Sequence, residues 1–163
     1  LRTKSDNLPA LGSRRPPENA ILVFSLSPEG VTRSVERGTS GFQSRLLHAR
    51  QAIRNGWRVR LCFDPVLAVP GWREVYRSAV DETFRRLPPD HVEEVSIGVF
   101  RIHPDYMKRI QKERHDAPLL FHSFARRDGL LSYEEELREE MVSFMIERIG
   151  SHVGPERITA VHG

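Results

Sequence analysis

Four polar residues stand at or near the ends of strand-like segments, where side chains of their types can do chemistry. Lys4 and Arg101 are cationic, Asp64 is anionic and Ser25 offers a hydroxyl group. A lysine ammonium reaches a carboxylate as a flexible point charge, whereas an arginine guanidinium suits phosphate. Barrel proteins carry their sites at the carboxyl ends of parallel strands. These residues are therefore candidates for contacts with a cofactor or a substrate.

The residues alone leave other interpretations of these positions open. Lys4 also fits a solvated surface lysine, and Ser25 fits a strand serine bonded to backbone. Arg101 also fits a salt bridge at the rim of a barrel. Cys62 lies two residues before Asp64, on the same face of a strand whose side chains alternate. A buried free cysteine is usually a small core residue, and Cys62 also fits that role.

Generic catalytic motifs are absent from the sequence. It contains neither a GxxxxGK phosphate loop nor GxGxxG, and it offers no serine-nucleophile elbow. A zinc or iron–sulfur site needs several closely spaced thiolates or imidazoles. One cysteine and seven scattered histidines do not supply them. We therefore expect no metal site within this chain.

The elements that must position these residues follow an α/β pattern. Strands are expected at residues 21–27, 58–66 and 95–102, because these runs are apolar or alternate apolar with polar side chains. Amphipathic helices are expected between Ser40 and Gly56, from 71 to 87 and after Pro104. Repeated strand–helix order predicts parallel strands joined by helical crossovers.

The sequence after residue 115 follows a different pattern. Asp128-Gly129 is a hairpin turn signal, residues 137–149 form an amphipathic helical stripe, and residues 158–161 suit a short strand. We divide the chain at this point into residues 1–115 and an extension, 116–163. Two capping boxes are also expected, which pair Ser40 with Gln43 and Ser132 with Glu135.

Composition fits one globular domain with a moderate basic excess. The chain has 163 residues, 39% of them hydrophobic, and a formal net charge of +3. Such a charge is compatible with a nucleic-acid partner. The apolar runs are too short for a membrane-spanning helix, so no membrane partner is expected. A single cysteine allows no intrachain disulfide, which favours a cytoplasmic location.

Several short motifs occur in a fixed order along the chain. They are Thr3-Lys4-Ser5, Phe24-Ser25-Leu26-Ser27, Glu36-Arg37-Gly38-Thr39-Ser40 with Arg45, Asn55-Gly56-Trp57, Arg60 to Val66, Gly71-Trp72 with Tyr76, Gly98 to Ile102, Asp128-Gly129 with Ser132-Tyr133, and Leu137 to Met141. In this order they resemble the spore photoproduct lyase family of radical S-adenosylmethionine (radical-SAM) proteins, and the resemblance covers most of the chain.

The resemblance implies that residues 1–115 are the C-terminal half of a partial (βα)6 barrel and that 116–163 add a hairpin and a helix. It implies S-adenosylmethionine as cofactor, with Lys4 at its carboxylate and Ser25 at its methionyl part. It also implies a 4Fe–4S cluster held by CxxxCxxC, which this chain lacks. The N-terminal half of the barrel is therefore expected outside this chain, and the chain alone is expected to be inactive.

The family's reaction implies a DNA partner. Its 5′-deoxyadenosyl radical repairs thymine-derived photolesions, so Asp64, Arg101 and Arg126 become candidate substrate contacts. Two features depart from the family pattern: an aspartate precedes Pro65, and the segment before the hairpin, Phe124 to Arg127, is less aromatic. The alternative is a noncatalytic half-barrel that binds nucleic acid or a partner chain. An in-frame CxxxCxxC upstream of the Leu1 codon would favour the enzyme.

Overall fold

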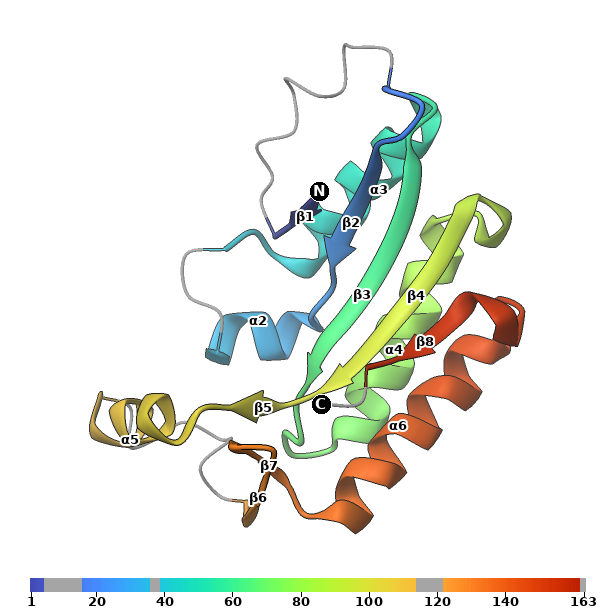
Figure 1. The fold of residues 1–163 in the computed structure, drawn as a ribbon. Helices are drawn as coiled ribbons and strands as arrows, with labels where there is room; N and C mark the ends of the chain where they lie inside the picture. The colour runs from blue at the N-terminus through green and yellow to red at the C-terminus, as the bar shows by residue number, and fades with distance from the viewer. Residues whose placement is uncertain (5–15, 36–38, 114–121, 162–163) are drawn as a thin grey trace.

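The main sheet is parallel throughout the residues that the computed structural model describes, which are 1–4, 16–35, 39–113 and 122–161. Its five strands run in chain order across the sheet, so the predicted α/β fold is confirmed (Figure 1). They are β1 (Arg2–Thr3), β2 (Ile21–Ser25), β3 (Arg58–Val66), β4 (Val92–Val99) and β8 (Ile158–Ala160).

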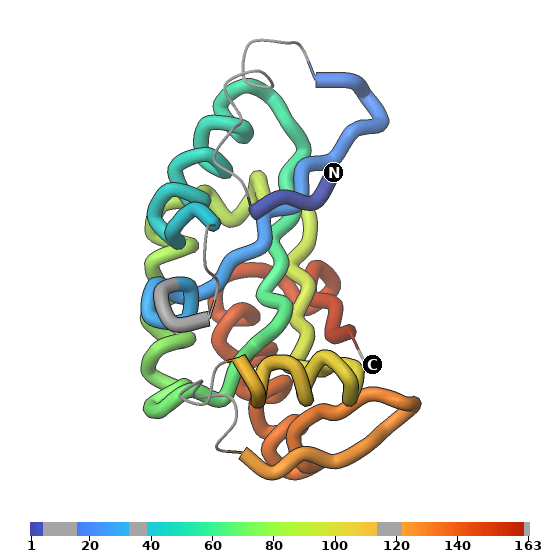
Figure 2. The backbone as a smooth tube through the Cα atoms, turned by 90° about the vertical axis from the view of Figure 1, so that its left-hand side faces the viewer, coloured from blue at the N-terminus to red at the C-terminus, as the bar shows by residue number. Residues whose placement is uncertain are grey.

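Helices lie on one side of this sheet, as the turned view in Figure 2 shows. Because the strand order never reverses, the connections return on the same face, as they do in a barrel. The helices are α2 (Glu29–Val35), α3 (Phe42–Arg54), α4 (Trp72–Arg86) and α6 (Glu135–Gly150).

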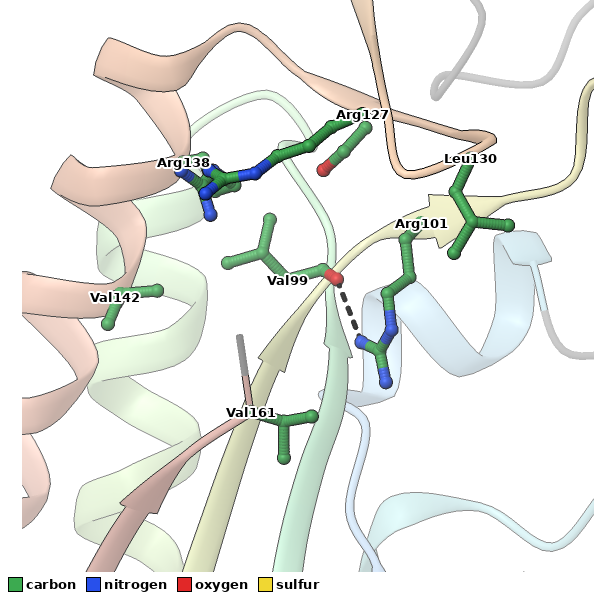
Figure 3. Close-up of a pocket in the computed structure, with 8 residues that line it drawn as sticks. Val99, Arg101, Arg127, Leu130, Arg138, Val142 and Val161 are labelled. Carbon is green, nitrogen blue, oxygen red and sulfur yellow. Dashed lines mark hydrogen bonds between the residues drawn. The ribbon is translucent and has the colours of Figure 1, made fainter. Parts of the chain in front are cut away.

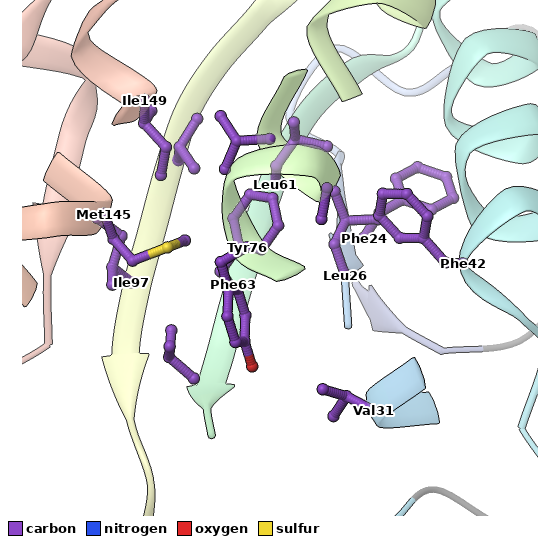
Figure 4. Close-up of a cluster of buried hydrophobic side chains, with 14 of the residues drawn as sticks. Phe24, Leu26, Val31, Phe42, Leu61, Phe63, Tyr76, Ile97, Met145 and Ile149 are labelled. Atoms are coloured by element: carbon purple, nitrogen blue, oxygen red, sulfur yellow. The ribbon is translucent and has the colours of Figure 1, made fainter. Parts of the chain in front are cut away.

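The two faces of the main sheet differ in chemistry because strand side chains alternate. The helix side is apolar: Phe24, Leu61 and Ile97 are 1%, 0% and 0% exposed and pack against α3, α4 and α6 (Figure 4). The opposite face is polar. One cross-strand row joins Ser25, Cys62 and Ser96, and the row before it joins Val23, Arg60 and Glu94.

A second, antiparallel sheet extends from the carboxyl end of the first. It has the order β5 (Arg101–Ile102), β7 (Leu130–Tyr133), β6 (Phe124–Arg127), and the short helix α5 (Pro104–Glu113) follows β5. Asp128 and Gly129 have positive φ angles and form the predicted hairpin turn. The proposed boundary near residue 115 falls in 114–121, outside the described residues.

Three predictions about local structure are wrong. The strand expected at 95–102 is two strands: β4 ends at Val99, and Arg101 pairs with Ser132 in the other sheet. The two capping boxes do not form either. Gly41 and Glu134 occupy the N-cap positions without side-chain cap bonds, and both serines donate elsewhere: Ser40 Oγ to the Lys4 carbonyl oxygen at 2.7 Å and Ser132 Oγ to that of Phe100 at 2.7 Å.

Candidate functional site

The carboxyl ends of β1 to β4 bring four of the five predicted site residues into one region. Lys4 directly follows β1, and Thr3 pairs with Phe24, so Lys4 lies next to Ser25 at the end of β2. Asp64 is near the end of β3. Arg101 follows β4 after one residue and turns back to Asp64. The polar face of the main sheet therefore ends in a group of opposite charges and hydroxyls.

Asp64 and Arg101 form a bidentate ion pair. Arg101 Nη1 donates to Asp64 Oδ1 at 3.1 Å and Nη2 to Oδ2 at 3.3 Å, and the side chains are 28% and 13% exposed. The pair crosses directly over Gly98 in β4. A Cβ atom there would lie 2.7 Å from Asp64 Cγ and 2.9 Å from Arg101 Nη1. Any side chain at position 98 would therefore force the Asp64–Arg101 pair to move.

Arg2 links Ser25 to Asp64 and was not predicted as a site residue. Its Nε donates to Ser25 Oγ at 2.9 Å, and its Nη2 donates to the Asp64 carbonyl oxygen at 3.1 Å. The guanidinium also lies 3.6 Å from Asp64 Oδ2. Arg2 remains half-exposed, whereas Ser25 is 1% exposed. Within the described residues, the Ser25 hydroxyl accepts this hydrogen bond and finds no acceptor for its own proton.

Arg45 fixes the backbone around Lys4 and Ser25. It is 1% exposed, and Nη1 donates to the Ser25 carbonyl oxygen at 3.0 Å. Nε donates to the carbonyl oxygen of Ser40 at 2.8 Å, and Ser40 in turn binds the Lys4 carbonyl. Nη2 donates to Thr39 Oγ1 at 2.9 Å. A buried charge is stable only when it is well hydrogen-bonded, as this one is.

A signal for Arg45 was present in the sequence. It lies on the apolar stripe of α3, three residues after Phe42 and directly before Leu46, where a core-facing hydrophobic residue is expected. A charged residue at such a position is rarely buried unless it is paired, so it predicts a buried hydrogen-bond or ion-pair partner. Of the family-like segment Glu36 to Ser40, residues 36–38 lie outside the described residues.

Cys62 lies under this site but is a buried thiol. It is 3% exposed, and burial raises the pKa of its thiol, while the hydrogen bond with Ser96 and the charges of Arg2 and Lys4 act in the opposite direction. A protonated thiol is a poor metal ligand and a poor nucleophile. Within the described ranges, no cluster of three histidine, cysteine or acidic side chains can hold a metal ion.

Arg126 lies apart from the other predicted site residues. It is exposed on β6, the outer strand of the second sheet, whereas Arg101 lies on β5 at the opposite edge. The next residue, Arg127, lines a small hollow with Val99, Arg101, Leu130 and the helix residue Arg138, shown in Figure 3. The sequence drew attention to Arg126 and did not indicate Arg138.

The site residues fit the polar part of S-adenosylmethionine. Lys4 and Arg2 supply positive charge for a carboxylate, and the Ser25 hydroxyl supplies a donor. A 4Fe–4S cluster does not fit, since the only cysteine of the sequence is the buried Cys62. In the described part of the chain, none of the helices has the length and apolar character needed to cross a membrane.

Comparison with solved structures finds the same fold in spore photoproduct lyase. The lyase complexed with dinucleoside spore photoproduct matches with a TM-score of 0.81 at 20% identity, over 98% of this chain and 49% of that chain. A mutant lyase with bound AdoMet and dinucleoside spore photoproduct gives 0.79 at 20% identity with the same coverage. No protein-family model and no curated protein sequence matches the chain.

The chain therefore spans about half the length of the lyase structures it matches. The expectation of half a partial barrel with a hairpin and helix extension is confirmed as a fold. The similarity to spore photoproduct lyase that the short motifs indicated is likewise confirmed at the level of the fold, since the identity is only 20%.

Proposed function

We propose that this chain is the C-terminal half-barrel of a radical-SAM enzyme that resembles spore photoproduct lyase and repairs thymine-derived photolesions in DNA. The observation that carries this proposal is the polar face of the main sheet. It ends in Lys4, Ser25, Asp64 and Arg101, in a fold that matches half of the lyase over 98% of the chain. A parallel sheet usually buries apolar side chains on both faces, so a polar face needs a functional reason.

In this proposal Lys4 and Ser25 bind the amino-acid part of S-adenosylmethionine. The Lys4 ammonium pairs with the carboxylate, and the Ser25 hydroxyl donates its free proton to the same moiety. Arg2 holds the Ser25 oxygen from the other side, which orients the O–H bond. Arg45 fixes the carbonyl of Ser25 and, through Ser40, that of Lys4. When bound, the cofactor supplies the abstraction of a hydrogen atom from the lesion.

Asp64, Arg101 and Arg126 are the proposed substrate contacts. The Asp64–Arg101 pair presents fixed charges at the strand ends, where an extruded lesion would enter. Arg126 on the exposed hairpin strand faces solvent and suits a backbone phosphate. The Arg101 guanidinium is already paired with Asp64, so further hydrogen bonds to it must come from particular directions. The pair therefore favours a substrate with matching donors and acceptors over a simple anion.

The other half of the barrel is the proposed partner. Among the described strands β1 lies at the edge of the main sheet, with β2 as its neighbour, so its other side is available for a further strand. The cluster ligands would lie on that partner segment. The 163-residue chain alone should take up no iron–sulfur cluster on anaerobic reconstitution, because one buried thiol cannot replace three thiolates.

A noncatalytic half-barrel is the second candidate, and one observation favours it. The Arg101 guanidinium is already occupied by Asp64, which departs from the family pattern at the residue before Pro65. Such a pair can also serve to hold a rim together. This candidate binds nucleic acid or a partner chain and needs no cofactor.

The two candidates differ in whether the chain supports turnover. The segment encoded upstream of the Leu1 codon would be co-expressed with the chain and reconstituted anaerobically, if it carries an in-frame CxxxCxxC. We expect 5′-deoxyadenosine from S-adenosylmethionine and two thymidines from dinucleoside spore photoproduct, both measured by liquid chromatography. The matched control replaces the three cysteines of that segment by alanine. A loaded cluster without either product would favour the noncatalytic half-barrel.

A further inference from the structure

Glu29 in α2 binds the first turn of the neighbouring helix α3. Its Oε2 accepts a hydrogen bond from the amide of Phe42 at 3.0 Å, and Phe42 is the first residue of α3. The first amides of a helix have no partner within that helix. Glu29 supplies a partner for one of them, and its negative charge suits the positive end of the α3 dipole. A single side chain therefore ties α2 to the start of α3.

Gly41 gives this carboxylate the space that it needs. It is the N-cap residue of α3 and has no side chain that could accept a cap bond. A Cβ atom there would lie 3.3 Å from Glu29 Oε2 and 3.4 Å from Oε1, and its nearest neighbours all belong to Glu29. The φ angle of −66° is one that alanine also adopts. Alanine at position 41 would therefore crowd the Glu29 carboxylate without straining the backbone.

The first turn of α3 also carries the buried Arg45. The Arg45 amide donates to the Gly41 carbonyl oxygen at 3.1 Å, which closes this turn. Its guanidinium donates to the carbonyl oxygens of Ser25 and Ser40, at 3.0 and 2.8 Å. Ser40 Oγ donates in turn to the Lys4 carbonyl oxygen at 2.7 Å. The position of the turn therefore determines where the backbone at Lys4 and Ser25 is held.

The helix that carries Glu29 is anchored to the end of β2. Thr32 in α2 is 4% exposed, and its Oγ1 donates to the Ser27 carbonyl oxygen at 3.1 Å. Ser27 follows shortly after β2, which ends at Ser25. The contacts thus form a closed ring, from β2 to α2, across Glu29 to α3, and through Arg45 back to Ser25. Breaking this ring at Glu29 would leave the position of Arg45 less well defined.

Close packing does not surround the contact on every side. A hollow of about 410 Å³ lies between α2, α3 and α4, and both Glu29 and Phe42 line it. Figure 4 shows the Phe42 ring in the core near Phe24 and Leu26. Apolar packing therefore holds the body of α3 on the sheet, while the hydrogen bond to Glu29 sets the position of its first turn.

We propose that Glu29 is a positioning residue for the cofactor site at Lys4 and Ser25. Its effect reaches these residues through the first turn of α3 and through Arg45. The inference rests on the proposed function, in which Lys4 and Ser25 bind the amino-acid part of S-adenosylmethionine. Glu29 lies outside the segments whose order resembles the lyase family, so the motifs did not indicate it.

The first test compares amide NMR signals of the free 163-residue chain. E29A removes the acceptor and should shift the signals of Lys4 and Ser25 as well as that of Phe42. E29Q keeps an acceptor oxygen, so it should leave the signals of Lys4 and Ser25 close to those of the wild type. E136A removes an exposed acidic residue from the first turn of α6 and is the matched control. A merely structural Glu29 would lower the melting temperature in E29A and leave the Lys4 and Ser25 signals in place.

Gly41 offers a second test, because the effect of its substitution depends on Glu29. G41A in the wild type should move the Glu29 carboxylate and shift the Lys4 and Ser25 signals in the same direction as E29A does. In the E29A background G41A should shift neither signal, because the nearest atoms that it would crowd are then absent. This double-mutant cycle isolates the contact, since two changes that act through one contact are not additive.

Titration with S-adenosylmethionine measures the consequence for the site. E29A should weaken binding about fivefold, within the range that the loss of a helix cap produces. E29Q should weaken it by less than about twofold, and E136A should bind like the wild type. Melting curves accompany every variant, so a general loss of the fold is recognised.

Several results would overturn the positioning role. These are unchanged Lys4 and Ser25 signals in E29A, equal shifts in E29A and E29Q, equal effects of G41A with and without Glu29, or wild-type affinity of E29A for S-adenosylmethionine. The NMR tests need no cofactor. If these shifts appear while the wild type binds no S-adenosylmethionine, the proposed cofactor site is rejected and Glu29 remains the residue that holds the two strand ends in place.

Discussion

The two faces of the main sheet are built from alternate residues of the same strands, and they carry out different tasks. In β3, Phe63 meets the helix layer and is 0% exposed, while its neighbours Cys62 and Asp64 belong to the polar face. The covered face contributes the free energy of folding through apolar burial. The polar face keeps charges and hydroxyls in fixed positions through hydrogen bonds from three arginines, Arg2 in β1, Arg45 in α3 and Arg101 in β5. We therefore expect mutations of neighbouring residues on the two faces to have different effects.

The largest contrast is expected between the adjacent residues Phe63 and Cys62. Phe63→Ala should lower the free energy of unfolding by about 3–5 kcal/mol, because it leaves a cavity under the helices. Cys62→Ala removes one small group and should cost about 1 kcal/mol. Urea denaturation of both variants measures the difference. Equal losses of unfolding free energy would mean that the polar face contributes as much to stability as the apolar face.

Arg45 tests whether the polar face depends on a buried charge from the helix side. Arg45→Met should cost about 3 kcal/mol, because the carbonyls of Ser25 and Ser40 lose their donors. Arg50→Met, on the exposed side of the same helix, is the matched control and should stay within about 0.5 kcal/mol of the wild type. If Arg45→Met is as stable as the control, the hydrogen bonds of Arg45 do not stabilise the polar face.

Gly98 tests the close approach of the Asp64–Arg101 pair. Gly98→Ala should destabilise the chain by about 1–3 kcal/mol, because the new Cβ would meet Asp64 Cγ at 2.7 Å. The control is Gly30→Ala in α2, where a Cβ meets no atom within 4 Å. That change should stabilise the helix by up to about 1 kcal/mol. Thermal unfolding distinguishes the two, and a neutral Gly98→Ala would show that the pair readily moves aside.

The smallest effect concerns the protonation of Cys62. Burial raises the pKa of its thiol, so the stability that comes from the protonated thiol is fully present below the ordinary pKa of a cysteine thiol. It is lost as pH rises through the higher pKa of the folded state. At pH 8 iodoacetamide should therefore alkylate the folded chain more slowly than the urea-unfolded chain. Equal rates in the two states would show that the polar face leaves the thiol accessible.

The sequence predicted the elements that repeat a hydrophobic period. The bounds of β3, 58–66, agree with the alternation of its side chains, and the hairpin turn at Asp128-Gly129 is where its turn chemistry indicated. The motif order also predicted the half-barrel and placed Lys4 and Ser25 on neighbouring strand ends. Both successes depend on local sequence patterns.

The failures concern partners that are distant in the sequence. Ser132 was assigned to a capping box, but its hydroxyl donates to the Phe100 carbonyl oxygen. The strand predicted at 95–102 included Arg101, but Arg101 pairs with Ser132 in the other sheet. Each residue had a plausible local partner, and tertiary contacts prevailed over it.

The most direct test of the central claim is the titration of the isotope-labelled 163-residue chain with S-adenosylmethionine, followed by NMR. The account predicts shifts of the amide signals of Lys4, Ser25 and Cys62. It also predicts that Lys4→Ala weakens binding about ten- to a hundredfold, while Lys108→Ala on α5, the matched exposed control, leaves it unchanged. Equal affinities of the Lys4→Ala and Lys108→Ala variants, or shifts confined to the helix side of the sheet, would contradict it.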